Sequence, residues 1–426
     1  MSSPPQRLPD HTAGAPPEPL RLLYVTPRLG IGGTELSTLT LASAMRDRGH
    51  CVLWASDVGP LATQARQESV ELCLLPLSGR RPWSALVGVR ALREQLGRFR
   101  PDIVHCQELA PALMAVLARV LLRPQRRRVA ETLCVSETRP KLIWHDRGIR
   151  HYRLAALTFR WAGDLVICNS NYERRLLRRS GLPDRRSVVV HNAMYLKPVP
   201  EGHSGDGFRA EVGIPAAARI VLCPGRLHPE KGQPYLLCAF EAVARVCPDA
   251  WLVLAGDGPT RAELESLAAG LQAAGRIVFA GARSDMPRLY REAEVVAMPS
   301  LAESFGNAAL ESLYYEKPLV ATRVGGTTEV TQDGRYGRLV PRADSSALAQ
   351  ALVDVLRNPA QAVAIASQGK REVEEYFTVD RLAREIEGVY RELLAGRADW
   401  STYATGATVR ALAHRAPAAV PTGTGT

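Results

Sequence analysis

Short apolar runs alternate along the chain with longer segments in which apolar residues recur every three or four positions. The first run, Leu20–Thr26, ends at a glycine-rich turn and is followed by a helical pattern over Leu36–Arg48. Short apolar runs bounded by turn residues predict buried strands, and the longer periodic segments predict amphipathic helices. Strands that alternate with helices are typical of an α/β fold with a parallel sheet.

The same alternation fills the first half of the chain up to residue 197. Besides the first two elements, the pattern predicts a helix over Ala85–Arg98 and strands over Cys51–Ser56, Leu72–Leu75, Asp102–Cys106, Val129–Leu133, Leu165–Asn169 and Val188–His191. We therefore predict one doubly wound, Rossmann-like domain over residues 20–197.

A polar stretch rich in Pro and Gly, residues 198–207, predicts a linker to a second domain of the same kind over residues 208–378. The second domain is predicted to hold a helix over Ser345–Arg357 and strands over Arg219–Cys223, Trp251–Ala255, Ile277–Phe279, Val295–Met298 and Leu319–Thr322. A last helical pattern covers residues 379–395. Residues 1–19 and 396–426 lack apolar periodicity, and we expect them to be disordered.

The composition is typical of a soluble globular protein, with 46% hydrophobic and 23% charged residues. No uncharged apolar run reaches the roughly 18–20 residues of a membrane span, and the first residues lack the apolar core of a signal peptide. The eight cysteines form no C-x-x-C pair, which favours reduced, buried thiols in a cytoplasmic protein.

Positive charge is concentrated in the first half, where residues 1–200 hold 30 Lys and Arg against 16 Asp and Glu. Between Arg139 and Trp161, basic residues are mixed with aromatic and aliphatic ones. This mixture suits a helix on an anionic membrane surface, and it suits a solvated face of core helices equally well. Nucleic acid is not predicted as a partner, because no helix-turn-helix, RRM or zinc pattern occurs.

Two glutamates eight positions apart, Glu303 and Glu311, flank a predicted helix start after the strand Val295–Met298. Asn307 is the predicted N-cap of that helix. Unpaired amides and the positive end of the helix dipole suit a diphosphate at this place, and the two carboxylates suit sugar and ribose hydroxyls. The alternative is an ordinary helix start that carries surface acids.

Two further turns carry candidate chemistry. Arg226 and Lys231 lie in a glycine-flanked loop after the first strand of the second domain, where a guanidinium and an ammonium suit a diphosphate. Gly32 and Gly33 lie between the first strand and helix of the chain, at the position of an anion-binding turn in a doubly wound sheet.

The string E-S-F-G-N-A-A-L-E over residues 303–311 resembles the E-x(7)-E signature of glycosyltransferase family 4. These are retaining sugar-nucleotide enzymes with the GT-B fold, in which two Rossmann-like domains face each other across a cleft. The resemblance covers about residues 20–395, and it implies that the first domain binds the acceptor, that the second binds the nucleotide sugar, and that helix 379–395 crosses back to the first domain.

The resemblance implies a role for each matching residue. Glu303, Arg226 and Lys231 are expected to be catalytic. The donor is expected to contact Gly32, Gly33, Gly225, Arg226, Lys231, Gly258, Arg283, Glu303, Phe305, Gly306, Asn307, Ala308 and Glu311. His105 and Cys134 are expected to contact the sugar or the acceptor, although the family usually has a histidine where this chain has Cys134.

We therefore expect a metal-independent hexosyltransferase that uses a UDP- or GDP-linked sugar as co-substrate and no cofactor. No D-x-D carboxylate pair for a metal-bound nucleotide occurs in the sequence. The acceptor is expected to be a glycan or a lipid-linked saccharide in cell-surface polysaccharide or glycolipid synthesis, at the inner face of a bacterial membrane. Two alternatives stay open: a catalytically weakened nucleotide-sugar-binding partner, favoured by Cys134, and a GT-B relative such as an epimerase or phosphorylase.

Overall fold

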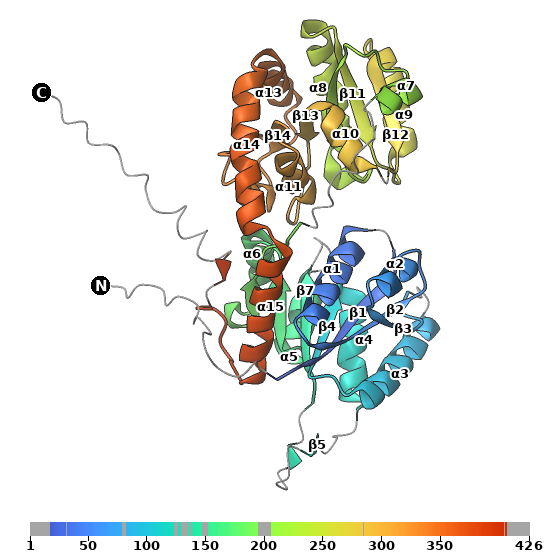
Figure 1. The fold of residues 1–426 in the computed structure, drawn as a ribbon, viewed down its shortest axis with the longest axis vertical. Helices are drawn as coiled ribbons and strands as arrows, with labels where there is room; N and C mark the ends of the chain where they lie inside the picture. The colour runs from blue at the N-terminus through green and yellow to red at the C-terminus, as the bar shows by residue number, and fades with distance from the viewer. Residues whose placement is uncertain are drawn as a thin grey trace, which may run out of the picture. The chain divides into compact units, whose positions relative to one another are not determined.

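The structure is a computed structural model of the 426-residue chain. It describes residues 18–30, 32–78, 82–122, 127–128, 135–136, 139–146, 152–194, 206–283, 285–403 and 405–406. The chain divides into two compact units (Figure 1). Unit 1 holds the described residues up to His191 and those from Leu382 onward, and unit 2 holds Asn192–Arg381.

Unit 1 is built on a seven-stranded parallel sheet with the order β3-β2-β1-β4-β7-β8-β9. Its strands are β1 (Arg21–Arg28), β2 (Cys51–Asp57), β3 (Glu71–Leu74), β4 (Ile103–Gln107), β7 (Lys141–Asp146), β8 (Leu165–Cys168) and β9 (Ser187–Val189). A separate two-stranded antiparallel pair joins β5 (Arg127–Arg128) and β6 (Val135–Ser136).

The helices of unit 1 are α1 (Gly33–Asp47), α2 (Ala62–Gln67), α3 (Pro82–Phe99), α4 (Leu109–Val120), α5 (Tyr152–Trp161), α6 (Asn171–Arg179) and most of α15 (Val379–Leu394), with the short 3-10 helix η1 at Asp184–Arg186. One core cluster contains buried side chains of α3, α4, α5 and α6, among them Leu92, Ala115, Phe159 and Leu177. These four helices therefore share a core with one face of the sheet.

Unit 2 is built on a six-stranded parallel sheet with the order β12-β11-β10-β13-β14-β15. Its strands are β10 (Arg219–Pro224), β11 (Ala250–Ala255), β12 (Ile277–Gly281), β13 (Ala293–Met298), β14 (Leu319–Thr322) and β15 (Arg338–Val340). The order reverses between β10 and β13, and ligands of doubly wound sheets bind at the carboxyl ends of strands at such a switch point.

The helices of unit 2 are α7 (Asp206–Val212), α8 (Gln233–Val246), α9 (Arg261–Ala269), α10 (Met286–Glu292), α11 (Asn307–Tyr314), α12 (Thr327–Val330), α13 (Ser345–Arg357) and α14 (Pro359–Tyr376), with the 3-10 helices η2 (Pro229–Lys231) and η3 (Ala274–Arg276). Central strands such as β10 and β13 are buried on both faces. This burial explains why their sequences read as continuous apolar runs rather than as alternating patterns.

The basic and aromatic segment Arg139–Trp161 is helical only in part, whereas both sequence-based interpretations placed it on helices. Its first part forms the inner strand β7, in which Leu142, Trp144 and His145 are buried, and only the second part forms a helix, α5. Packing of β7 between β4 and β8 outweighs the polar composition of the segment. The predicted strand Val129–Leu133 lies outside the described residues.

The chain ends also differ from the predictions where they are described. The segment after α15 was expected to be disordered, yet Trp400 is buried, its amide donates to the Arg185 carbonyl, and the Thr405 hydroxyl donates to the Val189 carbonyl. One tryptophan therefore anchors a polar segment onto unit 1. Most of the predicted linker and residues 1–17 lie outside the described residues.

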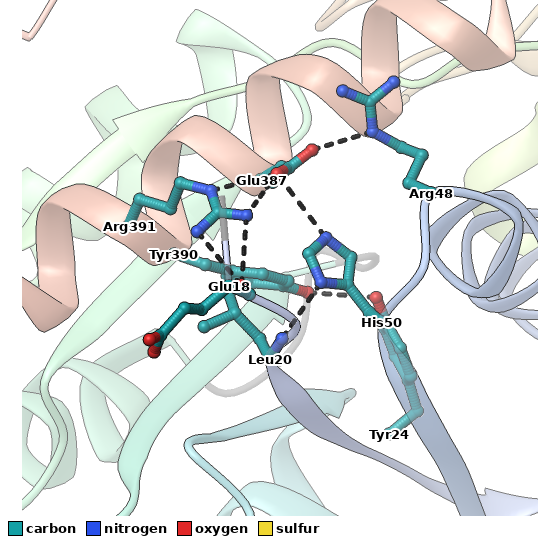
Figure 2. A network of polar contacts seen from close by, with 8 residues as sticks. All are labelled: Glu18, Leu20, Tyr24, Arg48, His50, Glu387, Tyr390 and Arg391. Atoms are coloured by element: carbon teal, nitrogen blue, oxygen red, sulfur yellow. Dashed lines mark hydrogen bonds and ion pairs between the residues drawn. The ribbon is translucent and has the colours of Figure 1, made fainter. Parts of the chain in front are cut away.

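Helix α15 is attached to unit 1 by a network of polar contacts around His50 (Figure 2). The His50 Nδ1 accepts a hydrogen bond from the Leu20 amide at 3.1 Å, and its Nε2 lies 3.5 Å from Glu387 Oε1. Glu387 also pairs with Arg48 and Arg391, each at 2.7 Å. Two arginines and a buried imidazole thus surround one carboxylate of α15.

Among the described residues, every helix is too short or too polar to cross a lipid bilayer.

Candidate active site

The loops after β10 and β13 meet at the switch point of the unit 2 sheet. The Leu301 amide donates to the Glu230 carbonyl at 2.8 Å, which joins the two loops directly. Gly232 has a left-handed φ of +65°, and a Cβ atom there would lie 2.1 Å from the Pro299 carbonyl oxygen. Only glycine therefore allows the two loops to approach this closely.

This approach brings the predicted cation and the predicted acid together. Lys231 Nζ lies 2.6 Å from Glu303 Oε2, and the Ser300 hydroxyl donates to the same oxygen at 3.2 Å. The Glu303 side chain is 12% exposed and the Lys231 side chain 30% exposed. The pair is therefore desolvated on one side and still open to a ligand on the other.

Arg226 lies in the same loop as Lys231, and its side chain is exposed. The buried side chain of Gln233 holds the loop by donating from Nε2 to the Arg226 carbonyl at 3.0 Å. No ion pair of Arg226 occurs among the described residues. The guanidinium is thus available to an anion from solvent.

The Glu303 loop rests on the glycine turn that follows β14. The Gly326 amide donates to the Glu303 carbonyl at 3.1 Å, and a Cβ atom on Gly325 would lie 1.6 Å from that carbonyl oxygen. Gly325 also has a left-handed φ of +54°. No role was predicted for this turn from the sequence, although a pair of glycines shortly after a strand indicates a close approach of backbones.

Helix α11 begins at Asn307, and the N-cap position belongs to Gly306, with a φ of +102° and no side-chain cap. The prediction that Asn307 is the N-cap was therefore wrong by one residue. The cause is that the left-handed turn falls on the glycine. The first amides of a helix have no acceptor within the helix. The amides of Asn307 and Ala308 are consequently placed to receive an anion beside Glu303.

Phe305 is buried, and its ring packs against Phe377 with centroids 6.0 Å apart. In this structure its side chain belongs to the core of unit 2, so only its backbone is available to a donor.

Glu311 lies one turn further along α11 and is partly buried. Its Oε2 accepts a hydrogen bond of 2.6 Å from the hydroxyl of Tyr290, which is fully buried. Burial raises the pKa of Glu311, and the hydrogen bond from Tyr290 opposes that rise. No motif in the sequence indicated Tyr290 or Ser300.

Three other residues of unit 2 were predicted to contact the nucleotide-sugar donor: Gly225, Gly258 and Arg283. Gly225 follows β10, and Gly258 lies against the backbone of Leu227, in the loop that carries Arg226 and Lys231. The Arg283 guanidinium is bound by two carboxylates, Asp285 at 2.7 Å and Glu211 at 2.5 Å, which raise its pKa. In this structure the Arg283 guanidinium is therefore occupied by these two carboxylates.

Gly32 and Gly33 lie in unit 1, at the N-cap and first position of α1. The Glu35 carboxylate folds back over this turn, so that a Cβ atom on Gly32 would lie 2.6 Å from Glu35 Oε2. Burial raises the pKa of Glu35. The Glu35 carboxylate therefore lies against Gly32, where a bound anion was expected.

His105 was expected at the end of a strand, in contact with the sugar or acceptor, and that contact stays a prediction. The strand β4 extends to Gln107, and the His105 side chain is fully buried. Its Nδ1 lies 2.5 Å from the Tyr390 hydroxyl and its Nε2 lies 3.1 Å from His145 Nδ1. A ring enclosed in this way supports the docking of α15. Cys134 lies outside the described residues.

No group of three or more His, Cys, Asp and Glu side chains is arranged to hold a metal ion within the part of the chain that the structure describes.

Two parallel-sheet, Rossmann-like domains in one chain are the architecture of the GT-B glycosyltransferase folds. HepE from Anabaena, solved in complex with UDP-glucose, aligns with a TM-score of 0.74 at 22% identity over 88% of this chain and 100% of that one. At this level of identity the likeness concerns the fold.

The chain belongs to the family 4 glycosyltransferases. Residues 31–197 match the family described as Glycosyltransferase Family 4, and residues 218–358 match Glycosyl transferases group 1. Both the predicted fold class and the predicted family are thereby confirmed.

Curated relatives include the D-inositol 3-phosphate glycosyltransferase of Saccharomonospora viridis, 35% identical over 44% of this chain and 46% of the relative. A GDP-mannose-dependent α-(1-6)-phosphatidylinositol monomannoside mannosyltransferase of Mycolicibacterium smegmatis is 28% identical over 65% of this chain and 74% of the relative. The chain thus spans about half the length of the more similar of the two.

Proposed function

We propose that this protein is a retaining glycosyltransferase that moves a sugar from a nucleotide diphosphate to a glycan or lipid-linked acceptor. The observation that carries the proposal is the 2.6 Å contact between Lys231 Nζ and Glu303 Oε2, which joins a cation and an acid from two loops at one switch point. Next to them, α11 presents its first amides. Membership of the glycosyltransferase family supports the same reaction.

In the proposed reaction, the bond between the anomeric carbon and the β-phosphate oxygen breaks. Lys231, Arg226 and the amides at the start of α11 stabilise the charge that develops on the leaving diphosphate. Because these groups supply positive charge themselves, we expect transfer without a required metal ion or other cofactor.

Glu303 accepts hydrogen bonds from sugar hydroxyls and holds the anomeric carbon toward the acceptor. The acceptor oxygen forms the new bond on the face that the diphosphate leaves, and a phosphate oxygen takes the acceptor proton. Glu311 accepts the ribose hydroxyls of the donor. The donor is a UDP- or GDP-linked sugar, as with the UDP-glucose bound to HepE and the GDP-mannose used by the mycobacterial relative.

The acceptor is proposed to be lipid-linked and presented at an anionic membrane surface on the cytoplasmic side. Apolar side chains are exposed on three helices that share the core of unit 1: Trp83, Leu86 and Val87 of α3, Leu117 and Val120 of α4, and Leu154, Leu157 and Trp161 of α5. Exposed arginines accompany them, including Arg90, Arg93, Arg153 and Arg160. Aromatic and aliphatic groups beside cations suit a membrane interface.

A panel of nucleotide sugars tests the reaction. One UDP- or GDP-linked sugar is expected to raise the thermal unfolding temperature and to be transferred or hydrolysed with retained anomeric configuration in the presence of EDTA. Binding without turnover would favour the nucleotide-sugar-binding partner. Recovery of turnover in Cys134→His would assign the loss to that position.

Vesicle sedimentation tests the membrane surface. Phosphatidylglycerol vesicles are expected to retain the protein at low salt, and phosphatidylcholine vesicles to retain less of it. A Trp83→Ala/Trp161→Ala variant is expected to bind more weakly than the parent. Equal binding of parent and variant would contradict the proposed surface.

A further inference from the structure

Tyr290 is the buried partner of Glu311, and the proposed reaction gives it no role. It lies in α10 and is 0% exposed. Its ring stacks on that of Tyr315, with centroids 5.2 Å apart and an angle of 16° between the planes. The hydroxyl donates to Glu311 Oε2 at 2.6 Å. Packing around the ring therefore fixes the direction from which Glu311 receives this hydrogen bond.

The protonation states of the two groups fit this hydrogen bond, with the Tyr290 hydroxyl as donor and the Glu311 carboxylate as acceptor. Burial raises the pKa of Tyr290 well above its ordinary value, so the hydroxyl keeps its proton at neutral pH. A partly buried carboxylate without a donor would tend to take up a proton, because burial disfavours its charged form. A hydrogen bond of this kind to a charged group is stronger than one between neutral groups.

Only one oxygen of Glu311 is engaged in this way. Among the described residues, no hydrogen bond reaches its Oε1. An ionised carboxylate offers about four lone-pair positions on its two oxygens, so the carboxylate can still accept two hydroxyl donors.

We propose that Tyr290 is a positioning residue for donor binding: its hydroxyl orients the Glu311 carboxylate so that the remaining lone pairs accept the 2′- and 3′-hydroxyls of a nucleoside diphosphate. The inference rests on the proposed function, because it requires the ribose to lie beside Glu311. A role in packing alone is the competing explanation, and it predicts no dependence on the ribose hydroxyls.

The test is calorimetric binding of UDP and of 2′,3′-dideoxy-UDP, with GDP and its dideoxy form in parallel, to the parent and to Tyr290→Phe. The variant keeps the ring and removes only the hydroxyl. It is expected to bind the ribonucleotide about tenfold more weakly than the parent, as for a lost hydrogen bond to a charged group. Both proteins are expected to bind the dideoxynucleotide equally.

Tyr315→Phe is the matched control. It removes the hydroxyl of the ring stacked on Tyr290, and within the described part of the chain that hydroxyl forms no hydrogen bond to Glu311. We expect its affinities for all four nucleotides to equal those of the parent.

The outcomes separate the inference from the proposed function. If the parent prefers the ribonucleotide and Tyr290→Phe keeps that preference in full, the role of Tyr290 is wrong and the proposed function stands. Equal losses for the ribo- and dideoxy-forms would likewise leave Tyr290 a packing residue. A parent that binds no nucleoside diphosphate at all would overturn both.

Discussion

Lys231 and Glu303 neutralise each other in the structure, with Nζ 2.6 Å from Oε2. The donor proposed for this site carries both a diphosphate, which attracts the lysine, and a sugar, which needs the carboxylate. Donor binding must therefore replace the ion pair by two new contacts. The free-energy cost of breaking the ion pair is moderate, because both side chains stay partly accessible to water.

Substitution of Glu303 by Gln is expected to reduce turnover about a hundredfold, because the amide keeps the shape of the side chain but loses its charge. The affinity for the donor is expected to change much less, since Lys231 becomes available to the diphosphate. Steady-state kinetics and UDP titration measure the two effects. Glu263→Gln, on the exposed surface of α9, is the control, and turnover of Glu303→Gln equal to that of the parent would contradict the role.

Substitution of Lys231 by Met is expected to weaken binding of UDP or GDP roughly tenfold or more, because a charged hydrogen bond to phosphate is lost. Lys370→Met provides a close comparison, since Lys370 also forms a 2.7 Å ion pair, with Glu316, in the same unit. Calorimetry should show weaker binding for Lys231→Met alone. Similar losses in both variants would indicate a general effect of charge.

Substitution of Gly325 by Ala is expected to destabilise unit 2 by about 2 kcal/mol or more, because the backbone is left-handed and the new Cβ atom meets the Glu303 carbonyl. Gly275→Ala, where nothing lies within 4 Å of the added atom, should change stability by less than about 0.5 kcal/mol. Chemical denaturation monitors both variants. Equal stability of the two would show that the turn after β14 relaxes without cost.

The stability of unit 1 is expected to fall as the pH drops through the ordinary pKa of histidine. Burial lowers the pKa of His50 below 6.5. The negative charge of Glu387 opposes this shift, and the positive charges of Arg391 and Arg48 lower the pKa further. The unfolded chain then binds more protons than the folded one at pH values between the two pKa values, so acid favours unfolding. Protonation of Nδ1 would also remove the acceptor of the Leu20 amide.

Thermal unfolding between about pH 7.5 and 5.5 measures this effect, around the ordinary histidine pKa. His50→Gln removes the titrating group and should flatten the dependence in that range. The same slope in parent and variant would place the titration elsewhere.

The elements that the sequence predicted best are those whose signal is local. The loop and helix around Glu303 and Glu311 combine a strand end, a glycine and an apolar helix face within one short stretch. The differences between the sequence-based expectations and the structure have a common cause in tertiary burial. Strand β7 reads as an amphipathic basic segment, and His105 reads as the end of a strand. The environment of β7 depends on pairing with strands distant in sequence, and that of His105 depends on packing against α15.

Tyr290 and Ser300 were missed for a similar reason. A tyrosine in a short helix and a serine after a strand carry no spacing that distinguishes them from core and loop residues. Their relation to Glu311 and Glu303 arises from the packing of α10 beside β10 and β13 and from the loop after β13. Such partners become visible only when the sheet brings separate segments together.

The assignment of α15 has a practical consequence for dissecting the molecule. The chain passes from unit 1 to unit 2 after His191 and returns after Arg381, so no single cut yields two intact halves. A fragment that stops before residue 382 would lack Glu387 and Tyr390, the partners of His50 and Tyr24. Unit 2, by contrast, is one continuous stretch, and it is the half to express separately for nucleotide titrations.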